Sequence, residues 1–123
     1  ESAAACGLHL SADRDPLRAT TAGVGELLCA ALSEGVRRVV VGVGGTASTD
    51  GGAGMAQAVG AWLLSPSGHP VDPGGAALAA LDRIDLTDLD PRLAGVEVVV
   101  AADVDAPLVG PEGAAERTVN KTG

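Results

Sequence analysis

Aromatic residues are almost absent from this chain of 123 residues, which contains one Trp and neither Phe nor Tyr. A hydrophobic core must therefore be built mainly from Val, Leu and Ala. The length fits one domain and is sufficient for a core of useful size. We expect a single small domain with an aliphatic interior.

Basic residues are also scarce, because 8 Lys and Arg stand against 16 Asp and Glu, giving a net charge of −8. A nucleic-acid surface needs clustered Lys and Arg to bind the phosphate backbone, and here the basic residues are scattered. The sequence therefore excludes a nucleic-acid partner. Any small anion that binds must be held by a local site.

Cysteines and long apolar runs are few. Cys6 and Cys29 form no CxxC motif, and the two histidines have no recognisable zinc spacing, so we interpret both cysteines as small buried or semi-buried thiols in a reduced setting. No apolar run reaches 18 residues and no signal-peptide pattern is visible, which argues against a membrane partner and against secretion. We expect a cytoplasmic protein.

The most informative stretch covers residues 39–64, where an apolar run breaks into glycine and then resumes with helical spacing. Its first part is β-branched and uncharged, as in a strand buried on both faces of a parallel sheet. The valines of this part are Val39, Val40, Val41 and Val43. Apolar residues then recur at i, i+4, i+7 and i+8, at Met55, Val59, Trp62 and Leu63. This spacing predicts a helix that extends to Leu64.

The turn between this strand and helix is rich in glycine and hydroxyl residues. Gly42, Gly44 and Gly45 remove side chains where the chain must turn. Four oxygen-bearing residues able to cap the helix follow: Thr46, Ser48, Thr49 and Asp50. Free N–H groups at a helix start favour phosphate or carboxylate. A second interpretation stays open, in which the glycines only permit close packing and the polar residues only cap.

Known nucleotide motifs fit this turn poorly. It lacks the GK[ST] ending of a P-loop, so no lysine is available for the β- and γ-phosphates. Gly42, Gly44 and Ala47 match a relaxed dinucleotide fingerprint. However, the acidic residue expected about 20 residues later would fall in a Pro- and Gly-rich loop. An oxidoreductase dinucleotide domain is therefore disfavoured.

Further elements are expected before and after this turn in the sequence. A threonine, Thr20 or Thr21, is expected to cap a helix that ends at the C-cap Gly35, and residues 76–81 can form a short helix. The helical spacing of the first helix is carried by Val24, Leu27, Leu28, Ala31 and Leu32. Residues 82–91 alternate acidic and apolar residues, which predicts loops and capping turns. Residues 96–102 form a second β-rich run that ends at Asp103.

If both strands belong to one parallel sheet, the glycine-rich turn and Asp103 emerge at the same carboxyl edge, where open α/β sheets bind ligands. Asp50, Asp103 and Asp105 are then the carboxylates that could hold a divalent ion or accept a substrate proton. Each of them alone could also be a cap, and Asp105 is the weakest of the three.

Four blocks in order resemble the bacterial-type glycerate kinase family. They are TTAGVGELLCAAL at 20–32, VGVGGTASTDGGAGMAQAVGA at 41–61, LTDLDPRL at 86–93 and AADVDAPLVGPEGAA at 101–115. The resemblance implies an ATP-dependent, Mg²⁺-assisted kinase that phosphorylates D-glycerate. It also implies two α/β domains with the active site between them, each with a parallel-sheet core and helices on both faces. Residues 1–123 would then be a partial domain from the middle of the enzyme.

The site residues follow where the motifs match. The family's GGSATNDGG corresponds to residues 44–52, and its DVTNPL to residues 103–108, in which Ala106 replaces the asparagine. We expect Asp50 and Asp103 to be catalytic, and Asp103 and Asp105 to bind the metal. Substrate or phosphate binding is expected from Gly44, Gly45, Thr46, Ser48, Thr49, Gly51 and Gly52.

The family's DSFK segment lies outside the chain, and only Lys121 matches its QKGA block, so we expect no turnover from the isolated chain. The alternative hypothesis is a catalytically inactive remnant that serves as an anion-binding or interaction domain. The sequence leaves open the oligomeric state and whether the 2- or the 3-hydroxyl is phosphorylated.

Overall fold

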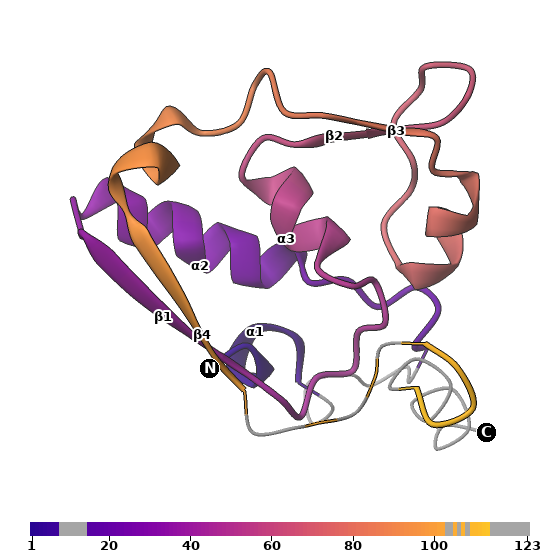
Figure 1. Cartoon of the computed structure of the whole chain (residues 1–123), viewed down its shortest axis with the longest axis horizontal. Helices are drawn as coiled ribbons and strands as arrows, with labels where there is room; N and C mark the ends of the chain where they lie inside the picture. Colours follow the sequence, from indigo (N-terminus) through magenta and orange to yellow (C-terminus); the bar gives the residue numbers. More distant parts are fainter. Residues whose placement is uncertain (8–14, 103–104, 106, 108, 114–123) are drawn as a thin grey trace.

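The computed structural model describes residues 1–7, 15–102, 105, 107 and 109–113, which form a mixed set of helices and strands (Figure 1). In chain order they are α1 (Ala3–Cys6), α2 (Ala22–Ser33), β1 (Arg38–Val43), α3 (Ala53–Ala58), β2 (Trp62–Leu64), the 3-10 helix η1 (Gly75–Ala80), β3 (Arg83–Asp85), the 3-10 helix η2 (Pro91–Gly95) and β4 (Glu97–Ala102). The short helix predicted at residues 76–81 is thus present as η1.

The two Val-rich runs pair as the parallel strands β1 and β4, which confirms the expected parallel sheet. Their register runs from Arg38 opposite Glu97 to Val43 opposite Ala102, so both strands end at the same edge. Because side chains alternate along a strand, Val39, Val41 and Val43 share one face. The carboxyl ends of both strands therefore meet where the sequence places the glycine-rich turn.

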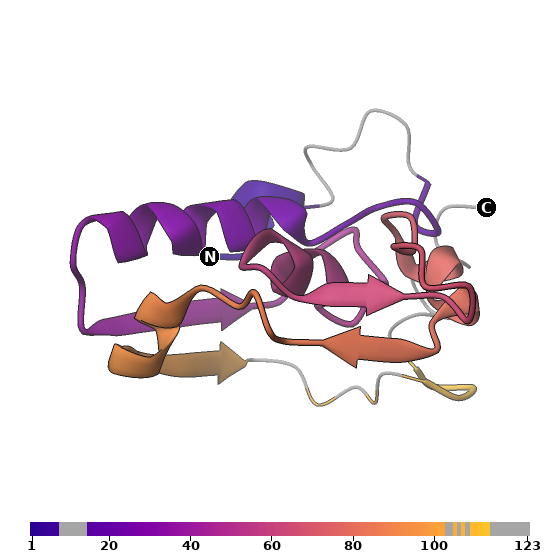
Figure 2. The same ribbon diagram turned by 90° about the horizontal axis from the view of Figure 1, so that it is seen from above.

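Helix α2 lies along one face of this strand pair, beside α3 (Figures 1 and 2). Leu28 and Leu32 of α2 form a buried cluster with Val59, and Val39 of β1 packs against it. Fully burying an aliphatic side chain contributes about 1.5–3 kcal/mol, so this cluster is a main source of the free energy that holds α2 to β1. The predicted helical spacing of α2 is thereby confirmed.

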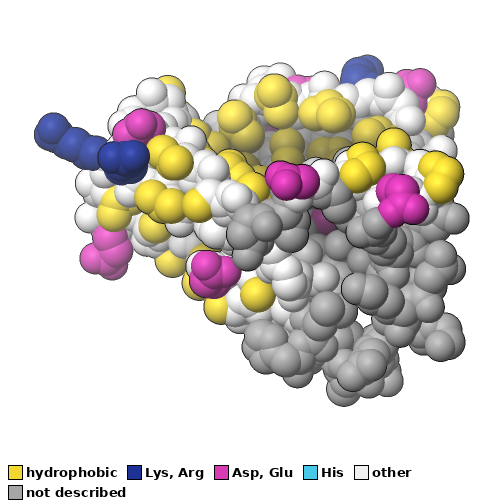
Figure 3. Space-filling model, turned by 60° about the horizontal axis from the view of Figure 1, so that its bottom comes forward, with side chains coloured by type: hydrophobic (Ala, Val, Ile, Leu, Met, Phe, Trp, Pro, Cys, Tyr) yellow, Lys and Arg dark blue, Asp and Glu magenta, His cyan; other side chains and the backbone are white. Residues whose placement is uncertain are grey.

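The opposite face of β1 is open. Val40, which points to that face, is 58% exposed, although the sequence predicts a strand buried on both sides. That prediction is wrong for the described residues, because no described helix packs over Val40. Helices on both faces of the sheet are likewise not found in this part of the chain. Hydrophobic side chains reach the surface in patches on the face shown in Figure 3.

The helix predicted to reach Leu64 is much shorter. Helix α3 ends at Ala58, and Trp62–Leu64 form β2, which pairs antiparallel with β3 inside the stretch predicted as loop and turns. Gly60 causes the break, because it adopts φ of 104° and a side chain there would collide with the Asp88 backbone. Leu63 is then buried with Ala61 and Val71 in a second small core.

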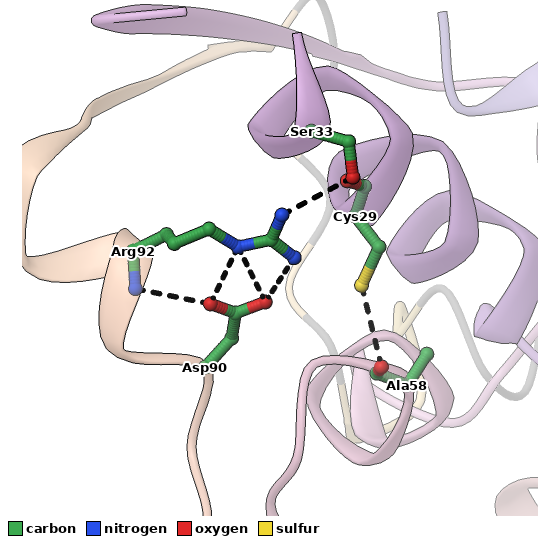
Figure 4. A network of polar contacts seen from close by, with 5 residues as sticks. All are labelled: Cys29, Ser33, Ala58, Asp90 and Arg92. Atoms are coloured by element: carbon green, nitrogen blue, oxygen red, sulfur yellow. Dashed lines mark hydrogen bonds and ion pairs between the residues drawn. The ribbon is translucent and has the colours of Figure 1, made fainter. Parts of the chain in front are cut away.

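A polar network links the C-terminal ends of α2 and α3 to the start of η2 (Figure 4). The Arg92 side chain binds both carboxylate oxygens of Asp90 and donates to Ser33 Oγ at 3.1 Å. Ser33 Oγ in turn donates to the Cys29 carbonyl, and Cys29 Sγ donates to the carbonyl of Ala58 in α3. These bonds fix η2 against the end of α2.

None of the helices in the described ranges is both long enough and apolar enough to cross a membrane.

Candidate functional site

The turn from β1 to α3 has a backbone shape that only glycine adopts easily. Gly44, Gly45, Gly51 and Gly52 all have positive φ, at 149°, 60°, 59° and 88°. Side chains rarely tolerate this region, so the glycines fix the path of the turn. The same glycines leave the backbone open to close approach by a ligand.

A cavity of about 390 Å³ lies beside this turn, between α2 and the parallel strands. One wall is apolar and comes from both strands and α2: Val41, Val43, Val98, Val100, Val24 and Leu28. The polar part comes from the turn: Gly44, Thr46, Ser48, Thr49, Asp50, Gly51 and Gly52. A mainly apolar pocket with a few convergent polar groups is the usual form of a small-molecule site. The cavity brings together every predicted turn residue except Gly45, which is exposed beside it.

Asp50 is the most constrained polar group of the site, at only 1% exposure. Its Oδ2 accepts hydrogen bonds from Thr21 N at 2.9 Å, Thr21 Oγ1 at 3.0 Å, Gly54 N at 3.0 Å and Thr20 Oγ1 at 3.4 Å. Its Oδ1 accepts from Gly52 N at 3.2 Å. Both carboxylate oxygens therefore face N–H and O–H donors.

These bonds join the starts of two helices. Thr21 precedes α2, and its hydroxyl donates to Asp50 while accepting from Met55 N of α3 at 2.9 Å. A carboxylate is stabilised where helix N-termini meet, because their free N–H groups have partial positive charge. The geometry favours a positioning role for Asp50, which fixes the turn and α3 against α2. Its predicted catalytic role stays a prediction.

The hydroxyl residues of the turn differ in how firmly they are tied. Thr49 Oγ1 donates to the Pro16 carbonyl at 2.7 Å, whereas Ser48 Oγ donates a longer hydrogen bond, of 3.9 Å, to the sulfur of Cys6. Burial raises the pKa of the Cys6 thiol. The hydrogen bond from Ser48 lowers this pKa and the nearby Asp50 charge raises it, and the net effect is a raised pKa. Cys6 is therefore a neutral thiol at ordinary pH.

The predicted metal ligands are not assembled by the described residues. Asp103 lies outside them, and Asp105 is exposed. Within the described ranges no three His, Cys, Asp or Glu side chains cluster as ligands for an ion, and the oxygens of Asp50 already face donors. These residues alone do not fit Mg²⁺, so its binding by Asp103 and Asp105 stays a prediction.

Besides the valines and Leu28 of the apolar wall, the residues Ser2, Thr21 and Met55 line the cavity although the sequence did not assign them to it. Thr21 was expected only as a helix cap. A Thr pair directly before a helix could have indicated a longer-range partner for one hydroxyl. Nothing in the sequence indicates Ser2, because it reaches the site through a backbone bond from its N–H to the Gly42 carbonyl.

Comparisons with known proteins show which sequences this chain is similar to. A profile described as "Glycerate kinase family" matches residues 1–117. The chain is 54% identical over 116 residues to the Bacillus subtilis protein named "Glycerate kinase", covering 93% of this chain and 30% of that protein. It is 48% identical over 116 residues to the Escherichia coli "Glycerate 2-kinase", with the same two coverages.

A solved structure is also similar to this chain. The crystal structure of "putative glycerate kinase 2" from Salmonella typhimurium superposes with a TM-score of 0.90 at 45% identity, over 99% of this chain and 34% of that one. The chain therefore spans about a third of the length of the relatives that it matches.

Proposed function

This chain belongs to the glycerate kinase family, and we propose that the complete protein that contains it transfers a phosphoryl group from ATP to D-glycerate. The observation that supports this most strongly is the cavity beside the residue 44–52 turn, which gathers hydroxyl groups and glycine backbone at the carboxyl ends of two parallel strands. The comparisons offer no support for an inactive remnant.

Phosphoryl transfer depends mostly on positioning and on neutralising charge, so a rigid binding turn is a large part of the machinery. In this proposal the turn's backbone N–H groups and hydroxyls hold an anionic group of a substrate. Asp50 keeps the turn in place through its bonds to Gly52 and Gly54. Asp103, which follows β4 in the sequence, orients or deprotonates the attacking hydroxyl.

When bound, Mg²⁺ would offset part of the negative charge of ATP. We propose Asp103 and Asp105 as its ligands, with further ligands from parts of the protein beyond the described residues. A cytoplasmic location and a two-domain architecture with helices on both sheet faces belong to the same proposal.

The test is product analysis on the complete protein. With D-glycerate, ATP and Mg²⁺, ³¹P NMR should show a phosphoglycerate formed in step with ADP. The position of the new phosphate ester also distinguishes the 2- from the 3-hydroxyl. ATP consumption that is the same with and without glycerate, or no phosphoglycerate signal, would refute the proposed function.

A further inference from the structure

Ser2 stands immediately before α1, where serine usually caps the helix with its hydroxyl, yet its side chain makes no capping bond. Its backbone is fully used, since its N–H donates to Gly42 at 2.8 Å and its carbonyl accepts from Cys6 N at 3.0 Å. The main chain is therefore fixed at the edge of β1. Only the hydroxyl is left without a role in the fold.

This hydroxyl is buried and has no hydrogen-bond partner. Ser2 is 6% exposed, and its Oγ is the one buried side-chain polar atom without a partner among the described residues. Buried polar groups almost always have a hydrogen-bond partner, because without one the free-energy cost of removing the group from water is not offset. An unpaired hydroxyl beside a cavity therefore indicates a partner that arrives from outside the fold.

The location of Ser2 identifies the partner's chemistry. Ser2 lines the same cavity as Thr46 and Ser48, so its hydroxyl belongs to a wall that is rich in hydroxyl residues. None of the described residues lining the cavity is Lys or Arg, the usual partners of a polyphosphate. A small acid with its own hydroxyls fits this hydroxyl-lined end better than the phosphate chain of a nucleotide does.

We propose that Ser2 is a substrate-binding residue whose Oγ donates a hydrogen bond to an oxygen of bound glycerate. The inference rests on the proposed function and adds a residue that the sequence motifs do not include. Serine has a single rotatable side-chain torsion, so directing Oγ toward the ligand needs one step between staggered positions. Binding thus supplies the partner that the empty site lacks.

The experiment compares Ser2→Ala with the parent in the complete protein. D-glycerate affinity is measured by titration calorimetry without ATP, and KM is measured for both substrates. Ser2→Ala should weaken D-glycerate binding and raise its KM about tenfold, as expected for one lost hydrogen bond. The KM for ATP should stay within about twofold. The melting temperature of the ligand-free variant should not fall, because only an unpaired hydroxyl is removed.

Ser67→Ala is the matched control, since Ser67 lies in an exposed turn and does not line the cavity. It should leave all these values unchanged. Parent-like D-glycerate affinity in Ser2→Ala overturns the assignment of Ser2 and leaves the proposed function standing, whether or not the KM for ATP changes. A parent protein that binds no D-glycerate overturns both.

Discussion

Asp50 shows how one buried carboxylate can organise a site without being free to react. It is 1% exposed, and its oxygens accept from the backbone of Thr21, Gly52 and Gly54. These bonds span both helix starts, so the position of the turn depends on them. The rule that Asn caps a helix about as well as Asp assumes one accepting oxygen, whereas here both oxygens accept.

Asp50→Asn should therefore destabilise the complete protein by about 3 kcal/mol, because the amide NH₂ must face a donor and leaves buried groups unpaired. Denaturant unfolding measures this loss. Asp72→Asn is the control, since Asp72 lies exposed in a loop and its change should have little effect. Unchanged stability of Asp50→Asn combined with a large loss of kcat would instead assign Asp50 to the chemistry.

Asp90 provides a prediction about pH. The Arg92 guanidinium, helped by the Arg92 backbone N–H, lowers the pKa of Asp90 to about 2. Since its folded pKa lies below the unfolded value of about 4, the stabilisation is complete above that value and is lost as pH falls through about 2.

Arg92→Met should raise the pKa of Asp90 toward its ordinary value, although the bond from the residue 92 backbone N–H keeps part of the shift. A ¹³C NMR titration of the side-chain carboxyl follows this directly. Asp85 is an internal control, because its pKa is lowered by hydrogen bonds from Thr87 and should not move. An Asp90 midpoint unaffected by the substitution would contradict this explanation.

At the scale of elements, α2 and α3 pack closely because Gly25 has no side chain. A Cβ at Gly25 would lie 2.6 Å from the Met55 carbonyl oxygen, which is too close for any normal contact. Helices can approach closely where one of them presents glycine. This contact holds α3, and thus the end of the glycine-rich turn, against α2.

Gly25→Ala should consequently destabilise the protein by about 1–3 kcal/mol through overpacking, although alanine is favoured over glycine inside a helix by about 1 kcal/mol. Thermal and denaturant unfolding measure the difference. Gly95→Ala is a suitable comparison, because a Cβ there meets nothing within 4 Å. If Gly25→Ala proved as stable as the parent, the proposed close approach of α2 and α3 would be wrong.

The elements also show which parts of the fold can be predicted from sequence. Strands β1 and β4 and helix α2 follow from local patterns, namely β-branched runs and helical spacing. The change from α3 to β2 does not follow from a local pattern, because Trp62 and Leu63 continue the helical spacing. Their strand depends on Gly60 and on pairing with β3, some 20 residues later. Long-range pairing outweighs local propensity there.

The candidate site also has some features that the sequence could locate and others that it could not. The glycine-rich turn could be located from its composition, because positive φ requires glycine. The hydrogen bonds of Asp50 to Thr20 and Thr21 could not be predicted from the sequence, because these residues lie about thirty positions apart and only the fold brings them together. Ser2 reaches the cavity through a backbone bond that no motif records.

At the scale of the whole molecule, the chain covers about a third of its relatives' length, and its parallel sheet leaves apolar surface uncovered. Val40, which points away from α2, is 58% exposed. Apolar strand surface of this kind is normally covered, because parallel sheets are buried on both faces in α/β proteins. The complete protein is therefore the right material for any kinetic test.

The central claim is that the residue 44–52 turn binds substrate and is more than a packing device. Kinetics of Gly51→Ala and Gly35→Ala in the complete protein test it, since both glycines are exposed with φ of 59° and 72° but only Gly51 lines the cavity. Both variants should lose about 1 kcal/mol of stability through the same backbone strain. Gly51→Ala alone should lower kcat/KM for glycerate or ATP about tenfold or more, and parent-like kinetics in both variants would contradict the claim.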